Sequence, residues 1–238
     1  MSDDSRESRD DMYQKLTDEK INELLETGIA EFAQNGRERA NINDIARKSG
    51  ISVGALYKYY GSKDEFFLAC LRHSLAVLKD VLSSAMEGEK KLLARAECLI
   101  RATQKCGRQY ETYNMMYNEI TAGRDREFAR VLSEEIEGMT AELYTKFIAD
   151  AEEDGTVRDD IDPGLFAFFF DNLLMTLQFS YSCDYYRERF KRYCGEDILD
   201  RDDLVADELM KFMESAFTFR RSDIIHGKAA DNEICDSL

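Results

Sequence analysis

Apolar residues recur at helical spacing along most of the chain. In the segment 18–35, five of them fall three or four positions apart and so share one helix face: Ile21, Leu24, Leu25, Ile29 and Phe32. Thr17 precedes this segment as an N-cap, and Asn35-Gly36 ends it because glycine readily adopts a left-handed conformation. No segment shows a convincing alternation of apolar and polar residues with a period of two, so the sequence predicts an all-α fold.

The same spacing predicts the remaining helices. A fourth helix follows the capping box Ser62-Lys63-Asp64-Glu65 and runs to about residue 86. The other predicted helices cover 42–49, 53–60, 90–107, 109–121, 125–152, 163–191 and 203–220. The chain is thereby predicted to contain a disordered acidic lead at 1–16, a small helical domain at 17–63, a larger one at 64–220 and a flexible tail at 221–238.

Two of these helices, 42–49 and 53–60, have the length and connection of a helix-turn-helix. Gly50-Ile51-Ser52 joins them, and glycine permits the tight turn. Four apolar residues can pack the pair together: Ile45, Ala46, Ile51 and Leu56. The small residues Gly54 and Ala55 would let the second helix approach DNA closely, and Ser52 can offer its hydroxyl to a phosphate.

The net charge of the chain is unevenly distributed along the sequence. The 238 residues include 32 Lys plus Arg and 48 Asp plus Glu, a net charge of −16 that by itself argues against nucleic-acid binding. Residues 37–63, however, contain six basic and two acidic side chains, whereas 1–36 contain four and ten and 64–238 contain 22 and 36. Positive charge is therefore concentrated at the candidate helix-turn-helix.

Three sequence segments resemble those of a known protein family. They are FAQNG at 32–36, INDIA at 42–46 and GISVGALYKYYGSKDEF at 50–66, within a match that covers about 18–70 without a gap. In these segments the chain resembles the TetR family of bacterial transcriptional regulators. The resemblance implies an all-helical homodimer with an N-terminal three-helix DNA-binding domain and a larger C-terminal domain that binds a small ligand and dimerises. Most such proteins are repressors that the ligand releases from DNA.

The resemblance also implies which residues contact the partner, double-stranded operator DNA. They are Asn41, Ser52, Val53, Gly54, Tyr57, Lys58, Tyr59 and Lys63. Asn41 would cap a helix and touch a phosphate, and Lys63 matches a common phosphate contact. The tyrosines and Lys58 would meet phosphates or bases. Val53 departs from the family pattern, because it can touch a thymine methyl group but cannot hydrogen-bond a base.

The C-terminal region is rich in aromatic residues, which fits either a ligand cavity or an ordinary helical core. If a small-molecule effector binds there, the candidate contacts are Tyr113, Tyr117, Phe147, Phe169, Asn172 and Thr176. The helices 163–191 and 203–220 stand where the family forms its dimer. The run 165–170 is apolar nearly all round, so a second copy of the chain is expected to cover one of its faces.

Other classes of protein find little support. The N-terminus lacks the apolar core of a signal peptide, and the apolar run 165–181 is interrupted by Asp171 and Asn172, so we expect a cytoplasmic protein without membrane contact. Six cysteines without a C-x-x-C pair, and only two histidines, predict no metal and no cofactor. Common catalytic motifs are absent, so we expect no enzyme activity.

Two alternative functions are also compatible with the sequence. The first is an architectural or nucleoid-associated protein of the same fold that binds DNA without an effector. The second is a redox-responsive regulator that uses Cys98, Cys106, Cys183 or Cys194.

Overall fold

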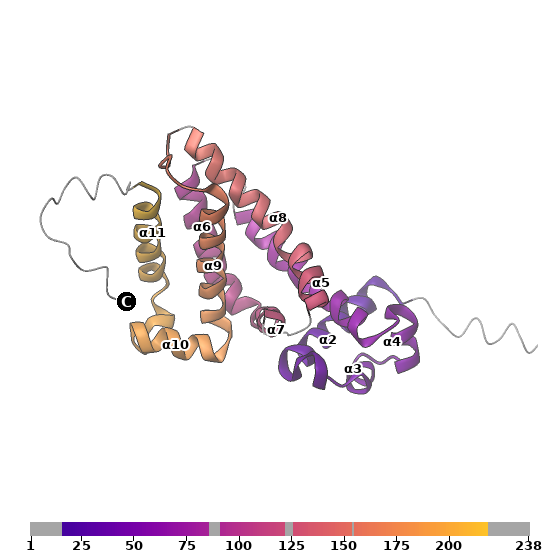
Figure 1. The fold of residues 1–238 in the computed structure, drawn as a ribbon. Coiled ribbons are helices and arrows are strands. Elements are labelled where there is room, and N and C mark those ends of the chain that lie inside the picture. Colours follow the sequence, from indigo (N-terminus) through magenta and orange to yellow (C-terminus); the bar gives the residue numbers. More distant parts are fainter. Residues whose placement is uncertain (1–15, 86–90, 122–125, 154, 219–238) are drawn as a thin grey trace, which may run out of the picture.

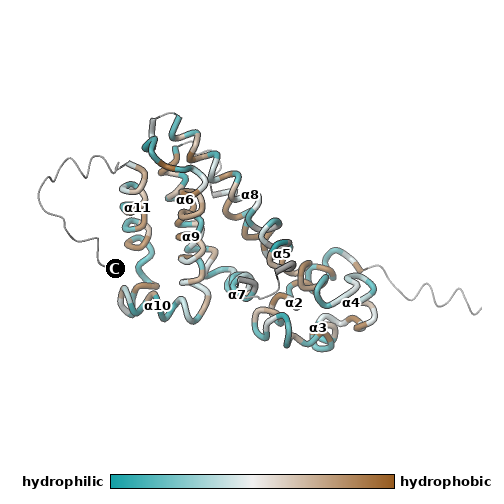
Figure 2. The backbone as a smooth tube through the Cα atoms, in the orientation of Figure 1, coloured by the Kyte–Doolittle hydropathy of each residue, from teal (hydrophilic) through white to brown (hydrophobic). Residues whose placement is uncertain are grey.

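The computed structural model describes residues 16–85, 91–121, 126–153 and 155–218, and these parts of the chain contain helices but no strands (Figure 1). The predicted all-α fold is confirmed. The acidic lead and the tail, apart from residue 16, lie outside the described residues. None of the described helices is long and apolar enough to cross a membrane. In Figure 2 hydrophobic and hydrophilic residues follow one another within short stretches of most helices, as amphipathic helices require.

The N-terminal unit consists of four helices around one hydrophobic core. They are α2 (Asp18–Arg39), α3 (Ile42–Lys48), α4 (Val53–Tyr60) and the first part of α5 (Lys63–Ala85), which gather at one end of the molecule in Figure 1. Helix α2 bends at Gly36, where φ is +72°, and continues to Arg39. The predicted end of this helix at residue 35 thus marks a kink rather than a terminus.

Helix α5 belongs to this core as well as to the rest of the molecule. Phe66 and Leu71 are fully buried against Leu24 and Phe32 of α2. Further along the same helix, Leu82 packs against the second hydrophobic core. A boundary drawn between residues 63 and 64 therefore falls within a continuous helix whose first turns complete the N-terminal unit.

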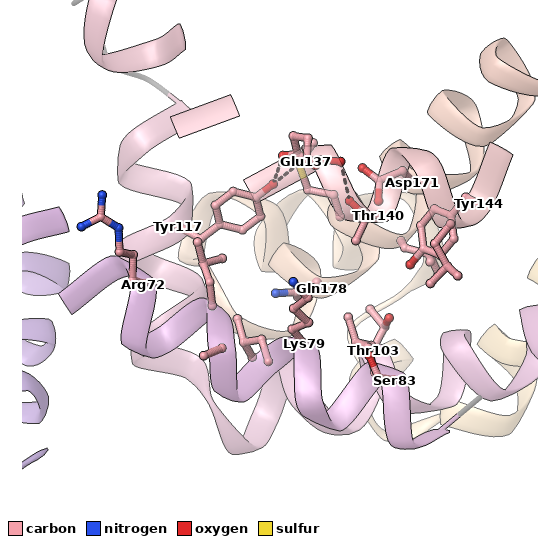
Figure 3. Close-up of a pocket in the computed structure, with 17 residues that line it drawn as sticks. Arg72, Lys79, Ser83, Thr103, Tyr117, Glu137, Thr140, Tyr144, Asp171 and Gln178 are labelled. Carbon is pink, nitrogen blue, oxygen red and sulfur yellow. Dashed lines mark hydrogen bonds between the residues drawn. The ribbon is translucent and has the colours of Figure 1, made fainter. Parts of the chain in front are cut away.

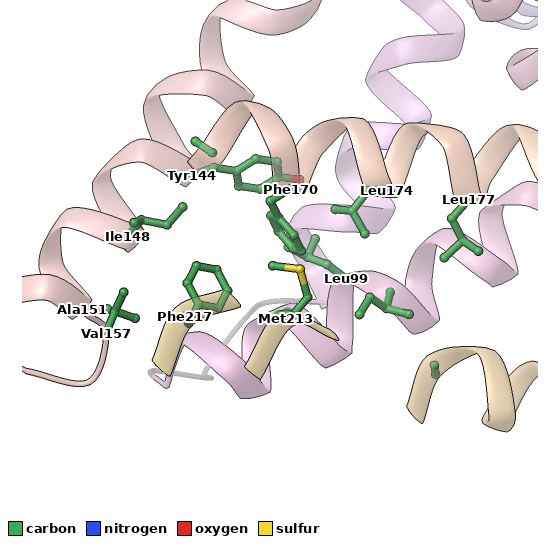
Figure 4. Packing of buried hydrophobic residues seen from close by; sticks show 14 of the residues in the cluster. Leu99, Tyr144, Ile148, Ala151, Val157, Phe170, Leu174, Leu177, Met213 and Phe217 are labelled. Atoms are coloured by element: carbon green, nitrogen blue, oxygen red, sulfur yellow. The ribbon is translucent and has the colours of Figure 1, made fainter. Parts of the chain in front are cut away.

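The C-terminal bundle is built around α9 (Pro163–Ser182). Helices α6 (Leu92–Gln109), α7 (Glu111–Thr121) and α8 (Arg126–Glu153) pack against it, and α11 (Asp202–Thr218) packs against α6 (Figure 1). The core between them is formed largely by aliphatic and aromatic side chains, and Figure 4 shows Leu99, Tyr144, Phe170, Leu174, Met213 and Phe217 among its members.

The prediction of a single helix over 163–191 is wrong. Helix α9 ends at Ser182, Cys183 is extended with φ −112° and ψ 130°, and a separate helix, α10 (Asp184–Cys194), follows. The Arg187 guanidinium donates two hydrogen bonds to the carbonyl oxygen of Tyr181, at 2.7 and 3.2 Å, and so supplies a partner at the end of α9. Apolar spacing continues across the break, which is why it gave no signal. A short 3₁₀ helix, η1 (Ile198–Asp200), leads into α11.

The crossing of α6 and α9 depends on the absence of a side chain at Gly107. A Cβ atom there would lie 2.5 Å from Cβ of Tyr181 and 3.2 Å from the backbone oxygen of Gln178. Both neighbours are held by α9 itself and cannot move aside as the tip of a flexible side chain could.

We expect the substitution Gly107→Ala to lower the free energy of unfolding by about 1–2 kcal/mol, because overpacking at this crossing outweighs the gain in helix propensity. Urea unfolding followed by circular dichroism measures the change.

Gly138 of α8 provides the matched control, since an added Cβ atom would have no neighbour within 4 Å. The substitution Gly138→Ala should leave the stability unchanged or raise it by up to about 1 kcal/mol. Equal effects of the two alanines would contradict the proposed steric role of Gly107.

Candidate nucleic-acid interface and ligand cavity

The two short helices α3 and α4 are each capped by a polar side chain. The side-chain oxygen of Asn41 accepts a hydrogen bond from the backbone N–H of Asn43 at 3.0 Å, and Oγ of Ser52 accepts one from the N–H of Ala55 at 3.0 Å. Gly50 between them has φ +64°. Leu56 is fully buried, so α4 packs one face on the core and presents the other to solvent.

Most of the predicted DNA contacts are on the surface of this unit. The exposed ones are Asn41, Ser52, Gly54, Tyr57, Lys58 and Tyr59, whereas Val53 and Lys63 are half-buried. Residues 57 and 58 follow residue 54 by three and four positions, which places both near residue 54 on the outer face of α4. Arg47 and Lys48 of α3 are exposed nearby in sequence, so the surface of α3 and α4 is positively charged.

Besides the two capping residues, Tyr59, Lys63 and Val53 also contact other parts of the protein. The Tyr59 hydroxyl accepts a hydrogen bond from the backbone N–H of Leu16 at 2.6 Å, and the Lys63 ammonium donates one to the carbonyl oxygen of Glu38 at 2.8 Å. Val53 packs against the N-terminal core. These residues therefore help to shape the surface, whatever they contact beyond it.

Sequence reasoning missed Glu31, which positions the start of α3. Its side chain is only 7% exposed. One carboxylate oxygen accepts hydrogen bonds from the backbone N–H of Asn41 at 3.1 Å and from the Asn35 amide at 2.9 Å, and the other lies 3.5 Å from Nζ of Lys48. The available signal was an acidic residue directly before Phe32 on the buried side of α2.

A cavity of about 460 Å³ lies in the C-terminal bundle (Figure 3). Its walls come from α5, α6, α7, α8 and α9, and most of their surface is apolar. The polar and charged residues that line it are Arg72, Lys79, Ser83, Thr103, Tyr117, Glu137, Thr140, Tyr144, Asp171 and Gln178. A largely apolar cavity with a few convergent polar groups has the character of a small-molecule site.

Two carboxylates share one region of this cavity. The Tyr117 hydroxyl donates a hydrogen bond of 2.7 Å to Glu137, and the Thr140 hydroxyl donates one of 3.1 Å to the Glu137 backbone oxygen. Burial, followed by the nearby negative charge of Glu137, raises the pKa of Asp171 to about 6. Burial is also the main reason that the pKa of the Tyr117 hydroxyl is raised.

Among the six residues predicted to bind an effector, Tyr117 lines this cavity and the others lie elsewhere. Tyr113 stacks on Tyr110, with 5.4 Å between ring centroids, and Phe147 lies beneath the Arg95 guanidinium at 4.1 Å. Phe169 is 56% exposed.

The last two predicted residues, Asn172 and Thr176, are half-buried on α9. The Asn172 amide donates a 2.7 Å hydrogen bond to the carbonyl of Phe168, within its own helix. The residues that sequence reasoning missed are Glu137 and Asp171, and Asp171 did give a signal because it interrupts the apolar run of α9.

Helix α7 connects the cavity to the N-terminal unit. Gln178, which lines the cavity, donates a hydrogen bond to the buried Asn114 of α7. From the same helix, the Tyr113 hydroxyl donates to Glu26 of α2, and the His73 ring of α5 meets that carboxylate at 3.0 Å. Helix α7 thus packs against both α9 and α2.

The described cysteines are not paired. Cys70, Cys106 and Cys183 are buried, and burial raises the pKa of each thiol. Since the thiolate is the reactive form, their surroundings reduce their reactivity towards oxidants. The described residues also contain no group of acidic, histidine and cysteine side chains that could hold a metal ion.

Comparison with known proteins agrees with the architecture. Residues 24–70 match the family described as bacterial regulatory proteins, tetR family. Over 168 residues the chain is 24% identical to the probable acrEF/envCD operon repressor of Escherichia coli K12, an alignment that covers 65% of this chain and 76% of that protein.

Solved structures show the same fold along most of the chain. A putative transcriptional regulator from Saccharomonospora viridis in complex with choline has a TM-score of 0.67 at 17% identity, covering 86% of this chain and 100% of that one. The regulator FadR of Bacillus subtilis in complex with stearoyl-CoA has a TM-score of 0.67 at 10% identity, covering 83% and 99%. The family match over residues 24–70, together with the helix-turn-helix, identifies this part of the chain as a DNA-binding domain of the TetR family of bacterial transcriptional regulators, and the solved structures show that most of the chain shares the fold.

Proposed function

We propose that this protein is a sequence-specific repressor that binds a palindromic DNA operator in the cytoplasm as a homodimer and leaves it when a small molecule fills the cavity. The observation that carries the proposal is the connection of two sites by shared helices. An exposed α4 lies at one end of α5, and the cavity lies along the other part of the same helix.

The DNA-binding part of the proposal rests on the outer face of α4. Gly54 leaves room for close approach of the helix, and Tyr57 and Lys58 are exposed on the same face. A short helix held by an N-cap and a buried Leu56 can enter a major groove as a rigid element. The positively charged surroundings would attract phosphates, while the acidic bundle would be repelled.

The proposed dimer uses the open faces of α9 and α11. Leu165, Phe168 and Phe169 are 56%, 61% and 56% exposed, and they share one face of α9. On α11, Phe212 is 60% exposed and Leu204, two turns earlier, is 38% exposed. Contiguous large apolar side chains at a surface typically mark an interface. A two-fold dimer would present its two α4 helices to successive major grooves about 34 Å apart.

Release from DNA is proposed to pass through α7 and α5. A ligand in the cavity would contact Tyr117 and Gln178, and so bear on α7 and its hydrogen bond to Asn114. Because α7 also contacts α2 through Tyr113 and Glu26, a shift of α7 would move the N-terminal unit relative to the bundle. The cavity favours this function over an architectural protein without an effector.

Introducing a negative charge on the outer face of α4 tests the DNA-binding surface. We expect Gly54→Glu to weaken binding to a DNA site selected from a random library by about 100-fold or more, because the carboxylate would face phosphates. An added Cβ atom at this position meets only Oγ of Ser52, at 3.9 Å, so the fold should be kept. Fluorescence anisotropy of labelled DNA measures the affinity.

The control for this charge is Gly138→Glu, which adds the same side chain to the exposed surface of α8. Its DNA affinity should stay within about twofold of the unaltered protein, since exposed charges far from the interface are screened. If Gly54→Glu kept full affinity, α4 would not be the element that enters the groove.

The proposed dimer predicts that Phe168→Glu yields monomers at micromolar concentration. Symmetry would place two carboxylates in one apolar interface, where an unpaired buried charge is strongly unfavourable. Light scattering after size-exclusion chromatography measures the mass. Tyr193→Glu on α10, at a tyrosine that is 78% exposed and off the proposed face, should remain dimeric. A monomeric unaltered protein would refute the interface.

A further inference from the structure

Among the described residues, the two carboxylates of the cavity wall have no ion pair. Glu137 enters the cavity from α8 and Asp171 from α9, and Figure 3 shows the two carboxylates on the same side, near Thr140. Within the described parts of the chain, the side-chain carboxylate of Asp171 has no hydrogen bond or ion pair. Glu137 accepts a hydrogen bond from the Tyr117 hydroxyl, but a neutral donor leaves its charge in place.

Neither Glu137 nor Asp171 forms an ion pair with the two basic residues of the cavity wall. Arg72 and Lys79 are both exposed residues of α5. In Figure 3 the Arg72 guanidinium is directed away from Glu137 and Asp171. The remaining lining is dominated by aliphatic and aromatic side chains, among them Leu143 and Leu174.

We infer that the effector is an organic cation with an apolar body, whose ammonium group lies between Glu137 and Asp171. This rests on the proposed function, in which a small molecule enters the cavity. The apolar body would lie along Leu143 and Leu174, and the ring of Tyr117 would flank the positive charge, since aromatic faces attract cations. The volume of about 460 Å³ suits a molecule of drug size.

The energetics of Asp171 point the same way. Its pKa of about 6 means that burial and Glu137 make its ionised form unfavourable in the empty cavity. A bound cation would reverse this effect, because an opposite charge favours the ionised carboxylate. An anionic ligand would add a third negative charge and raise the electrostatic penalty instead.

Three probes of equal chain length separate head-group charge from apolar burial: decyltrimethylammonium, 1-decanol and decanoate. Calorimetry with the full-length protein should give the cation an affinity about tenfold or more above that of either other probe, since opposite charges attract strongly in a largely apolar cavity. Tighter binding of decanol or decanoate, or no binding of the cation at millimolar concentration, would overturn the inference.

Neutral isosteres of the acids provide the matched variants. Asp171→Asn and Glu137→Gln should each weaken binding of the cation by about tenfold and leave the affinity for decanol within about twofold, because each removes one negative charge. Asp171→Asn should also unfold at a higher temperature at about pH 7.5, because a raised carboxyl pKa means that stability falls as pH rises through it. Equal cation affinity in all three proteins would remove the acids from the site.

Acidification gives an independent readout, because the probe keeps its charge at every pH. Affinity for decyltrimethylammonium should fall between about pH 7.5 and 5.5 as Asp171 becomes protonated, and Asp171→Asn should abolish that fall. The other ionisable groups of the wall are Glu137 and Tyr144 on α8, Tyr117 on α7, and Arg72 and Lys79 on α5. A fall that persisted in Asp171→Asn would assign it to another group.

DNA affinity measured with each probe bound distinguishes ligand-controlled release of DNA from the preference of the cavity for a cation. A cation that binds through Asp171 but leaves DNA affinity unchanged would refute ligand-controlled release while supporting the cation site between Glu137 and Asp171. Decanoate that binds more tightly than the cation and releases DNA would refute the inference while supporting the proposed function.

Discussion

Helix α5 takes part in two hydrophobic cores, and this shared helix constrains how the two ends of the molecule can move. Its first turns bury Phe66 and Leu71 beneath the helix-turn-helix, and its later turns form a wall of the cavity through Leu78 and Leu82. Helix α7 adds a second connection, because it contacts α2 on one side and α9 on the other. In the proposed mechanism, these two helices pass a change in the width of the cavity to the N-terminal unit.

Two parts of the molecule differ in the charge that they present: the surface of α3 and α4, and the cavity of the bundle. The chain is acidic overall, yet the segment 37–63 is positive, and that segment contains α3 and α4. In the cavity, Glu137 and Asp171 face a largely apolar space and form no ion pair with the basic residues of its wall. Half-buried carboxylates without an ion pair do not stabilise a fold, and their place in a cavity fits the binding of a ligand.

The sequence predicted the N-terminal unit well because its signals are local. Capping residues such as Ser52 and the positive φ of Gly50 depend on neighbours only a few positions away. The break at Cys183 gave no such signal, since apolar spacing continues through it and the capping partner, Arg187, acts through its side chain. The cavity was missed for a related reason: periodicity identifies aromatic residues but not which face borders a void between several helices.

Reciprocal coupling between ligand and DNA is the most direct test of the central claim, that the cavity controls release. Binding free energies are linked, so a ligand that weakens DNA binding must itself bind more weakly to the DNA complex. We expect the calorimetric dissociation constant of decyltrimethylammonium to be about tenfold or more higher for the operator-bound protein than for the free protein. Equal constants for the free and bound protein would contradict the claim.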